Sequence, residues 1–96
     1  MTQKEILEYL SKHKEQFKKR YSVRKIGIFG SYARNEATPK SDIDIVVDLE
    51  NATMFGLAAI KNDIEDYFKT EVDIVQIRDK MNRLLKKRIE KEAIYV

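Results

Sequence analysis

The chain contains no cysteine, only one proline and only three glycines among its 96 residues. Without cysteine it can form no disulfide bond and no thiolate metal site, which is typical of proteins of a reducing cytoplasm. The scarcity of glycine and proline excludes long flexible linkers. A chain of this length has no room for a second hydrophobic core. We therefore expect residues 1–96 to form a single cytoplasmic domain.

Long hydrophobic runs are missing as well. No stretch approaches the roughly 20 apolar residues that a membrane-spanning helix needs. The first 15 residues also lack the apolar segment of a signal peptide. We therefore expect a soluble protein without membrane association.

Positive charge exceeds negative charge only slightly, with a formal net charge of +3. The excess is gathered in two clusters, which consist of Lys12, Lys14, Lys18, Lys19 and Arg20, and of Arg83, Lys86, Lys87, Arg88 and Lys91. Basic clusters can bind nucleic acid by releasing its counterions, but a solvated helix face is the commoner explanation. The aromatic residues that could stack on bases recur at helical spacings typical of a core: Tyr9, Phe17, Tyr67 and Phe68. We therefore do not expect nucleic acid to be the partner.

Hydrophobic periodicity divides the chain into alternating helices and strands. Thr2 and Glu5 form a capping box that begins a first helix, whose apolar stripe fades near Arg20. Thr53 and Asp79 are the caps that we predict for two later helices. Apolar runs that end at turn residues predict strands. In chain order the predicted elements are a helix over 2–20, a strand over 25–29, a short helix over 31–36, a strand over 42–49, a helix over 53–68, a strand over 71–77 and a helix after 79.

The order of these elements predicts an α/β (α+β) fold, in which helices flank a small mixed sheet of about three strands. The connection between the first two strands is too short for a crossover, so we expect these strands to be antiparallel neighbours. The long helix between the second and third strands is typical of a parallel crossover.

Aspartates open two of the predicted strands. Side chains alternate faces along a strand, so Asp42 and Asp44 point to one face while Ile43 and Ile45 point to the other. Adjacent like charges repel and aspartate disfavours strands, and such violations are expected mainly where function requires them. Asp73 lies near the start of the next strand, so a parallel pairing brings it to the same edge. Three carboxylates there predict a magnesium site, and two such ions can serve one phosphoryl transfer.

Gly30 and Ser31 follow the first predicted strand and open a short helix. Glycine lets the backbone approach a polyphosphate, the serine hydroxyl can donate a hydrogen bond, and the start of a helix favours anions. Because the first two strands are expected to be antiparallel, this pair should face Asp42 and Asp44. Arg34 is a further candidate for contact with nucleotide phosphate, although an arginine in a short surface helix is more often solvated or ion-paired.

Gly30-Ser31, ten intervening residues and Asp42-Ile43-Asp44 together resemble the signature of the DNA polymerase beta-like nucleotidyltransferase superfamily. The longer string GSYARNEATPKSDIDIVV is similar to that of its minimal branch, the small antitoxin-type proteins paired with HEPN-domain toxins. The resemblance extends from the strand before Gly30 to Asp73. It departs at Asn35, where the branch often has glycine, but asparagine tolerates a left-handed backbone.

The resemblance implies a polymerase beta-like nucleotidyltransferase fold and a magnesium-dependent transfer of AMP from ATP to a hydroxyl group, such as that of a tyrosine on the partner toxin. It implies that Gly30 and Ser31 hold the nucleotide phosphates and that Asp42 and Asp44 coordinate both magnesium ions. It implies that Asp73 binds the catalytic ion and helps to deprotonate the incoming hydroxyl. The modification would silence the toxin, so the chain would act as an antitoxin, in an oligomer with that partner or alone.

Two other functions remain open at this point. A catalytically idle relative could act as a partner-binding antitoxin or regulatory domain, and it would gain no extra stability from magnesium and ATP together. A nucleic-acid-binding module would use the basic clusters, and its binding would be salt-sensitive and would survive loss of the aspartates.

Overall fold

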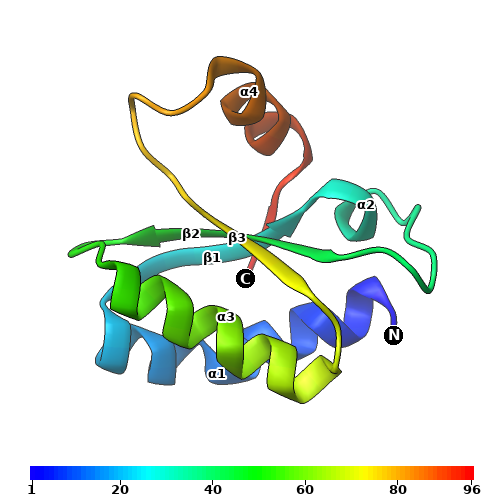
Figure 1. The fold of residues 1–96 in the computed structure, drawn as a ribbon, viewed down its shortest axis with the longest axis horizontal. Helices are drawn as coiled ribbons and strands as arrows, with labels where there is room; N and C mark the ends of the chain where they lie inside the picture. Colours follow the sequence, from blue (N-terminus) through cyan, green and yellow to red (C-terminus); the bar gives the residue numbers. More distant parts are fainter.

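The computed structural model of the protein describes residues 1–96 and contains one mixed sheet with helices on both faces (Figure 1). The elements in chain order are α1 (Gln3–Tyr21), β1 (Val23–Phe29), α2 (Gly30–Ala33), β2 (Ile43–Leu49), α3 (Met54–Phe68), β3 (Val72–Gln76), α4 (Arg83–Glu92) and β4 (Ile94–Tyr95). None of the helices has the length and apolar character that crossing a bilayer requires.

The sheet has the strand order β3-β2-β1-β4. The prediction that the first two strands are antiparallel is confirmed, and so is the parallel pairing of the second and third strands. The predicted caps of the first and third helices are also confirmed, because Thr2 accepts from the backbone N–H of Glu5 and Thr53 accepts from that of Gly56. These two helices therefore begin where the sequence indicates.

The larger hydrophobic core lies between the sheet and the pair α1 and α3, which cover the same face (Figure 1). Alternate residues of β2 point into this core, and Ile43, Ile45 and Val47 are fully buried there. The opposite face carries a smaller apolar cluster of Phe29, Val46 and Ile89, the last from α4. Because the strand alternates, Asp42 and Asp44 lie on this second face, beside the smaller cluster.

The last helix begins later than predicted. Asp79 does not cap it and lies exposed in the preceding turn, whereas Asn82 is the N-cap and accepts a hydrogen bond from the backbone N–H of Leu85 at 3.1 Å. Both side chains are competent caps, so composition does not choose between them. The packing of Ile89 against Phe29 and Val46 fixes the helix in space and thereby its start.

A fourth strand, β4, adds to the three that were predicted. Ile94 and Tyr95 pair antiparallel with Ile28 and Gly27 of β1. A side chain at Gly27 would collide with the backbone of Ile94, so glycine permits this close approach. Two residues carry too little alternation to predict a strand, and the pairing exists because α4 returns the chain to β1.

Candidate active site

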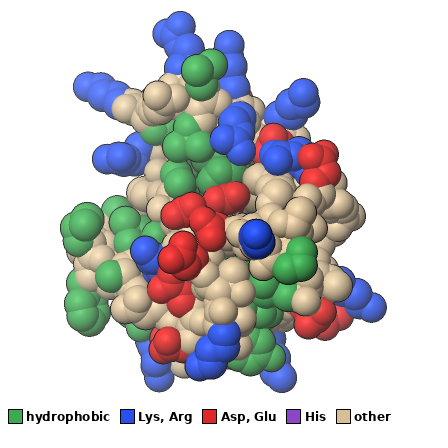
Figure 2. All heavy atoms as spheres, turned by 45° about the vertical axis from the view of Figure 1, so that its right-hand side comes forward, with side chains coloured by type: hydrophobic (Ala, Val, Ile, Leu, Met, Phe, Trp, Pro, Cys, Tyr) green, Lys and Arg blue, Asp and Glu red, His purple; other side chains and the backbone are tan.

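The three aspartates lie at one edge of the sheet, on the face that carries α4. In the parallel pairing of β2 with β3, Asp44 stands directly opposite Asp73. Asp42 precedes the first residue of β2 and, two residues from Asp44, shares its face. Figure 2 shows acidic side chains side by side in the middle of one face of the molecule, with lysine and arginine side chains above them. The structure thus brings Asp42, Asp44 and Asp73 to a common edge.

The three carboxyl groups differ in their surroundings. Asp42 and Asp73 are exposed, whereas Asp44 is half-buried. Burial raises the pKa of the Asp44 carboxyl, and the charges of Asp73 and then Asp42 raise it further, while Arg88 and Arg34 lower it. Asp44 is therefore the group whose ionisation is costly in the absence of a cation.

The aspartate side chains do not form a ready-made metal cage, because no group of three or more carboxylate, histidine or cysteine side chains is gathered closely enough to hold a metal ion. The donors nevertheless suit magnesium, which takes few protein carboxylates and keeps the remaining positions for water and phosphate oxygens. Burial, and after it repulsion by Asp73 and Asp42, raises the pKa of Asp44, and a divalent cation would relieve that repulsion. The residues at this edge therefore fit the metal that the sequence predicts.

Gly30 lies against Asp44, at the end of β1. Phe29 pairs with Asp44 across the antiparallel ladder, and Gly30 begins α2 with a φ of +72°. A Cβ atom at position 30 would collide with the Asp44 carboxylate. Glycine is therefore required here both by the left-handed backbone and by the closeness of a charged side chain. Ser31 follows as a half-buried residue of α2, so the predicted phosphate corner and the carboxylates are neighbours.

Arg34 is exposed and already ion-paired. Its guanidinium lies 3.0 Å from a carboxylate oxygen of Glu92 and 3.4 Å from one of Glu36. Glu92 also accepts a hydrogen bond from the backbone N–H of Gly30 at 3.1 Å. Glu92 of α4 thus links Arg34 to the backbone of Gly30 at the edge of the site.

Sequence reasoning missed two residues of α4 that belong to these surroundings, Arg88 and Glu92. Arg88 lies close enough to lower the pKa of Asp44, and Glu92 contacts both Gly30 and Arg34. Their spacing of four residues places them on one face of a helix. Leu85 and Ile89 indicate which face of α4 packs on the sheet, but no local pattern places Arg88 and Glu92 beside Gly30 and Asp44, so they could be found only from the packed structure.

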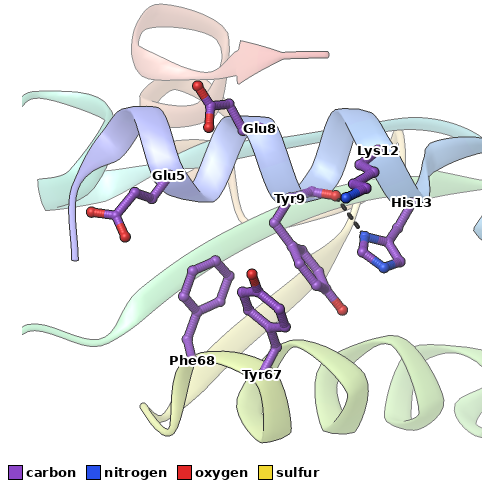
Figure 3. A pocket seen from close by; sticks show the side chains of 7 residues that line it. All are labelled: Glu5, Glu8, Tyr9, Lys12, His13, Tyr67 and Phe68. Carbon is purple, nitrogen blue, oxygen red and sulfur yellow. Dashed lines mark hydrogen bonds between the residues drawn. The ribbon is translucent and has the colours of Figure 1, made fainter.

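A hollow away from the carboxylates lies between α1 and α3 (Figure 3). It has a volume of about 510 Å³. The ring of Tyr9 lies 4.1 Å from that of His13 and 4.5 Å from that of Tyr67, centroid to centroid. Tyr67 is exposed, which corrects the prediction that it occupies a core position. The hollow contains none of the predicted site residues and lies on the opposite face of the sheet.

The sequence matches a known family over most of its length. The model of the nucleotidyltransferase domain family matches residues 10–96. A Methanocaldococcus jannaschii protein named as a candidate protein adenylyltransferase is 43% identical over 96 residues, which cover 99% of this chain and 98% of that protein. The protein adenylyltransferase MntA of Thermococcus cleftensis is 34% identical over 97 residues, which cover 100% of this chain and 97% of that protein.

Solved structures share the fold. The structure of a candidate minimal nucleotidyltransferase matches with a TM-score of 0.70 and 32% identity, over 92% of this chain and 93% of that chain. A chain of the complex between the tri-AMPylated Shewanella oneidensis HEPN toxin and MNT antitoxin also matches with a TM-score of 0.70, over 98% of this chain and 71% of that chain. Identity to the latter is 18%, so it speaks for the fold alone.

Proposed function

The chain belongs to the nucleotidyltransferase domain family, and from this premise we propose that it transfers AMP from ATP to a hydroxyl group of a partner HEPN-domain toxin and thereby acts as its antitoxin. The observation that carries the proposal is the pairing of Asp44 with Asp73 beside Gly30, where carboxylates meet a backbone corner suited to phosphate. The names of the M. jannaschii and T. cleftensis relatives support adenylyl transfer to protein.

In this proposal the aspartates divide the work of the reaction. Asp42 and Asp44 would coordinate both magnesium ions, and Asp73 would bind the catalytic ion and help to accept the proton of the acceptor hydroxyl. Magnesium, when bound, neutralises phosphate charge and lowers the pKa of a hydroxyl at its surface. Asp73 is exposed, so a hydroxyl from another molecule can approach it. Asp44 is half-buried and lies against Gly30.

The nucleotide is held by the other side of the corner. The backbone N–H of Gly30, the hydroxyl of Ser31 and the guanidinium of Arg34 are donors for the triphosphate oxygens. They align the α-phosphorus with the acceptor, whose oxygen forms a new bond to phosphorus as the bond to the bridging oxygen of pyrophosphate breaks. Positioning and charge neutralisation dominate such a displacement, which asks little covalent chemistry of the protein.

A docking partner is supported by apolar side chains that the fold leaves uncovered. Met54 and Phe55, at the start of α3, are 84% and 78% exposed. Met54 lines a groove of about 520 Å³ that reaches Val75 of β3, which shares a face with Asp73 two residues away. Exposed apolar surface of this kind is typical of contact with another protein. A chain of the same fold is paired with a HEPN toxin in a solved complex, and from this likeness of fold we propose a HEPN-domain protein as the partner.

The test is incubation of the chain with magnesium, labelled ATP and the protein encoded by the adjacent reading frame, followed by intact-mass measurement of both proteins. We expect the partner to gain one or more AMP units, and no gain with Asp73→Asn. Absence of AMP on the partner, although magnesium and ATP together raise the unfolding temperature of the chain, would indicate an idle nucleotide-binding relative. Absence of both effects would overturn the assignment of the site.

A further inference from the structure

The carboxylate of Glu92 occupies the corner between Gly30 and Arg34. Glu92 is the last residue of α4, and its side chain is only 15% exposed. One carboxylate oxygen accepts from the backbone N–H of Gly30 at 3.1 Å, and the other accepts from the Arg34 guanidinium at 3.0 Å. An anionic group of the chain itself is therefore held by a backbone donor and a cationic side chain together.

These donors are two of those that the proposed function assigns to the nucleotide. A carboxylate and a phosphate are alike in presenting charged oxygens at hydrogen-bond distance from such donors. The Gly30 N–H has one proton and makes one good hydrogen bond at a time. A phosphate oxygen on Gly30 therefore requires Glu92 to leave, since two anions side by side would also repel.

We propose that Glu92 is an internal competitor of the triphosphate, which must displace it from Gly30 and Arg34, and that Glu92 thereby sets the affinity for nucleotide. This inference rests on the proposed function, because it assumes that the corner binds phosphate. In this role Glu92 weakens the binding of nucleotide rather than strengthening it.

The displacement needs only a side-chain rotation. The backbone at Glu92 is anchored on both sides, by the hydrogen bond from the Ala93 N–H to the Ile89 carbonyl and by the pairing of Ile94 with Ile28. Arg88 lies one helical turn earlier, and its guanidinium is 4.0 Å from the Glu92 oxygen that accepts from Gly30. When phosphate occupies the corner, Glu92 turns to Arg88, so its charge stays paired in both states.

The sharpest test is calorimetric titration of the Glu92→Gln variant with magnesium tripolyphosphate and with magnesium ATP. Glutamine keeps the shape of the side chain but loses the charge that holds Arg34, so we expect both probes to bind about five- to tenfold more tightly than to the wild type. Glu90→Gln removes the same charge from the same helix at an exposed position, and Glu36→Gln removes the other partner of Arg34. Each control should change affinity by less than about twofold.

A measurement on the wild type complements the variants. The side-chain carboxyl carbon resonance of Glu92 and the amide resonance of Gly30 should both shift as tripolyphosphate saturates the protein, because their mutual hydrogen bond is broken. Unchanged or weaker binding to Glu92→Gln would overturn the proposal, since it would mean that Glu92 positions the donors for phosphate or has no part in binding. If no variant and no wild-type sample bound either probe, the proposed function would fall together with it.

Discussion

Asp44 is the residue at which function and stability conflict most directly. It is half-buried, and burial together with Asp73 and Asp42 raises its pKa. We expect Asp44→Asn to lower AMP transfer by at least about a hundredfold, because it removes a metal-binding carboxylate. The same change should raise the unfolding temperature of the metal-free protein at pH 7 by a few degrees, because it relieves a repelled charge. Transfer assays, and thermal unfolding in the presence of a chelator, measure the two effects.

The pH dependence of that gain follows from the direction of the shift. A carboxyl whose pKa is raised on folding stabilises the folded state below its unfolded value, about 3.9 for aspartate, and that contribution is lost as the pH rises through the folded pKa. The advantage of Asp44→Asn should therefore be absent well below pH 4 and grow above it. Asp48→Asn, on the same strand, breaks an ion pair with Arg24 and should give no such gain. An equal rise for both variants at pH 7 would contradict the account.

Asn35 tests how the backbone, rather than a side chain, shapes the turn that follows α2. Its φ of +58° is left-handed, a backbone conformation that asparagine tolerates better than most residues. We expect Asn35→Ala to lower the free energy of unfolding by about 1 kcal/mol, while Asn35→Gly leaves it nearly unchanged. Urea unfolding of the three proteins decides the matter, and equal stability of the alanine and glycine variants would mean that the left-handed backbone carries no cost.

At the scale of elements, the start of α4 offers a direct comparison of two capping residues. Asn82 caps the helix and Asp79 does not. Asn82→Ala should therefore lower the free energy of unfolding by about 1 kcal/mol, and Asp79→Ala should change it by less than about 0.5 kcal/mol. Chemical denaturation measures both. A larger loss of stability for Asp79→Ala than for Asn82→Ala would mean that the helix begins after Asp79, as predicted from the sequence.

The sequence was sufficient for those elements whose signals are local. The alternation of Ile43, Asp44 and Ile45 predicts both the strand and the face of the acidic side chain, and capping residues begin α1 and α3 correctly. The parallel pairing that sets Asp44 opposite Asp73 follows from a helix of crossover length between two strands. The roles assigned to these aspartates stay predictions, but their meeting at one edge needed no more than periodicity and handedness.

What the sequence could not supply depends on where α4 lies. The contact of Glu92 with Gly30 joins residues 62 positions apart, and it exists because Ile89 packs on Phe29 and Val46. Leu85 and Ile89 mark the apolar face of α4, but their periodicity does not tell which part of the sheet that face packs against. The same packing returns the chain to β1 and creates β4. The contact of Glu92 with Gly30 and the strand β4 therefore could not be predicted from local sequence.

At the scale of the whole molecule, one face of the sheet carries the main hydrophobic core and the other carries the candidate active site. The face under α1 and α3 contains most of the fully buried side chains, such as Ile45 and Ile60. That core can sustain the fold while the opposite face carries repelling carboxylates, a glycine corner and only a small apolar cluster. Local rules are violated on the face where we place the chemistry, as is expected when stability is supplied elsewhere.

The separation of the core from the candidate site also predicts where a partner would bind without disturbing the nucleotide. Met54 and Phe55 are among the most exposed large apolar side chains, and Met54 lines the groove that leads to β3. The double variant Met54→Ser, Phe55→Ser should keep its free energy of unfolding within about 0.5 kcal/mol, because neither side chain is buried. It should keep its stabilisation by magnesium and ATP, but AMP transfer to the partner should fall by about tenfold or more.

Tyr67→Ser is the matched control, because it removes another exposed side chain at the far end of the same helix. Tyr67 packs on Tyr9 with ring centroids 4.5 Å apart, so the control should lose some stability and yet retain AMP transfer at the wild-type rate. The opposite pattern, with transfer lost in Tyr67→Ser and kept in the double variant, would place the partner on the α1 and α3 face. The acceptor hydroxyl would then have to reach Asp73 around the edge of the sheet, which makes the groove beside β3 the shorter path.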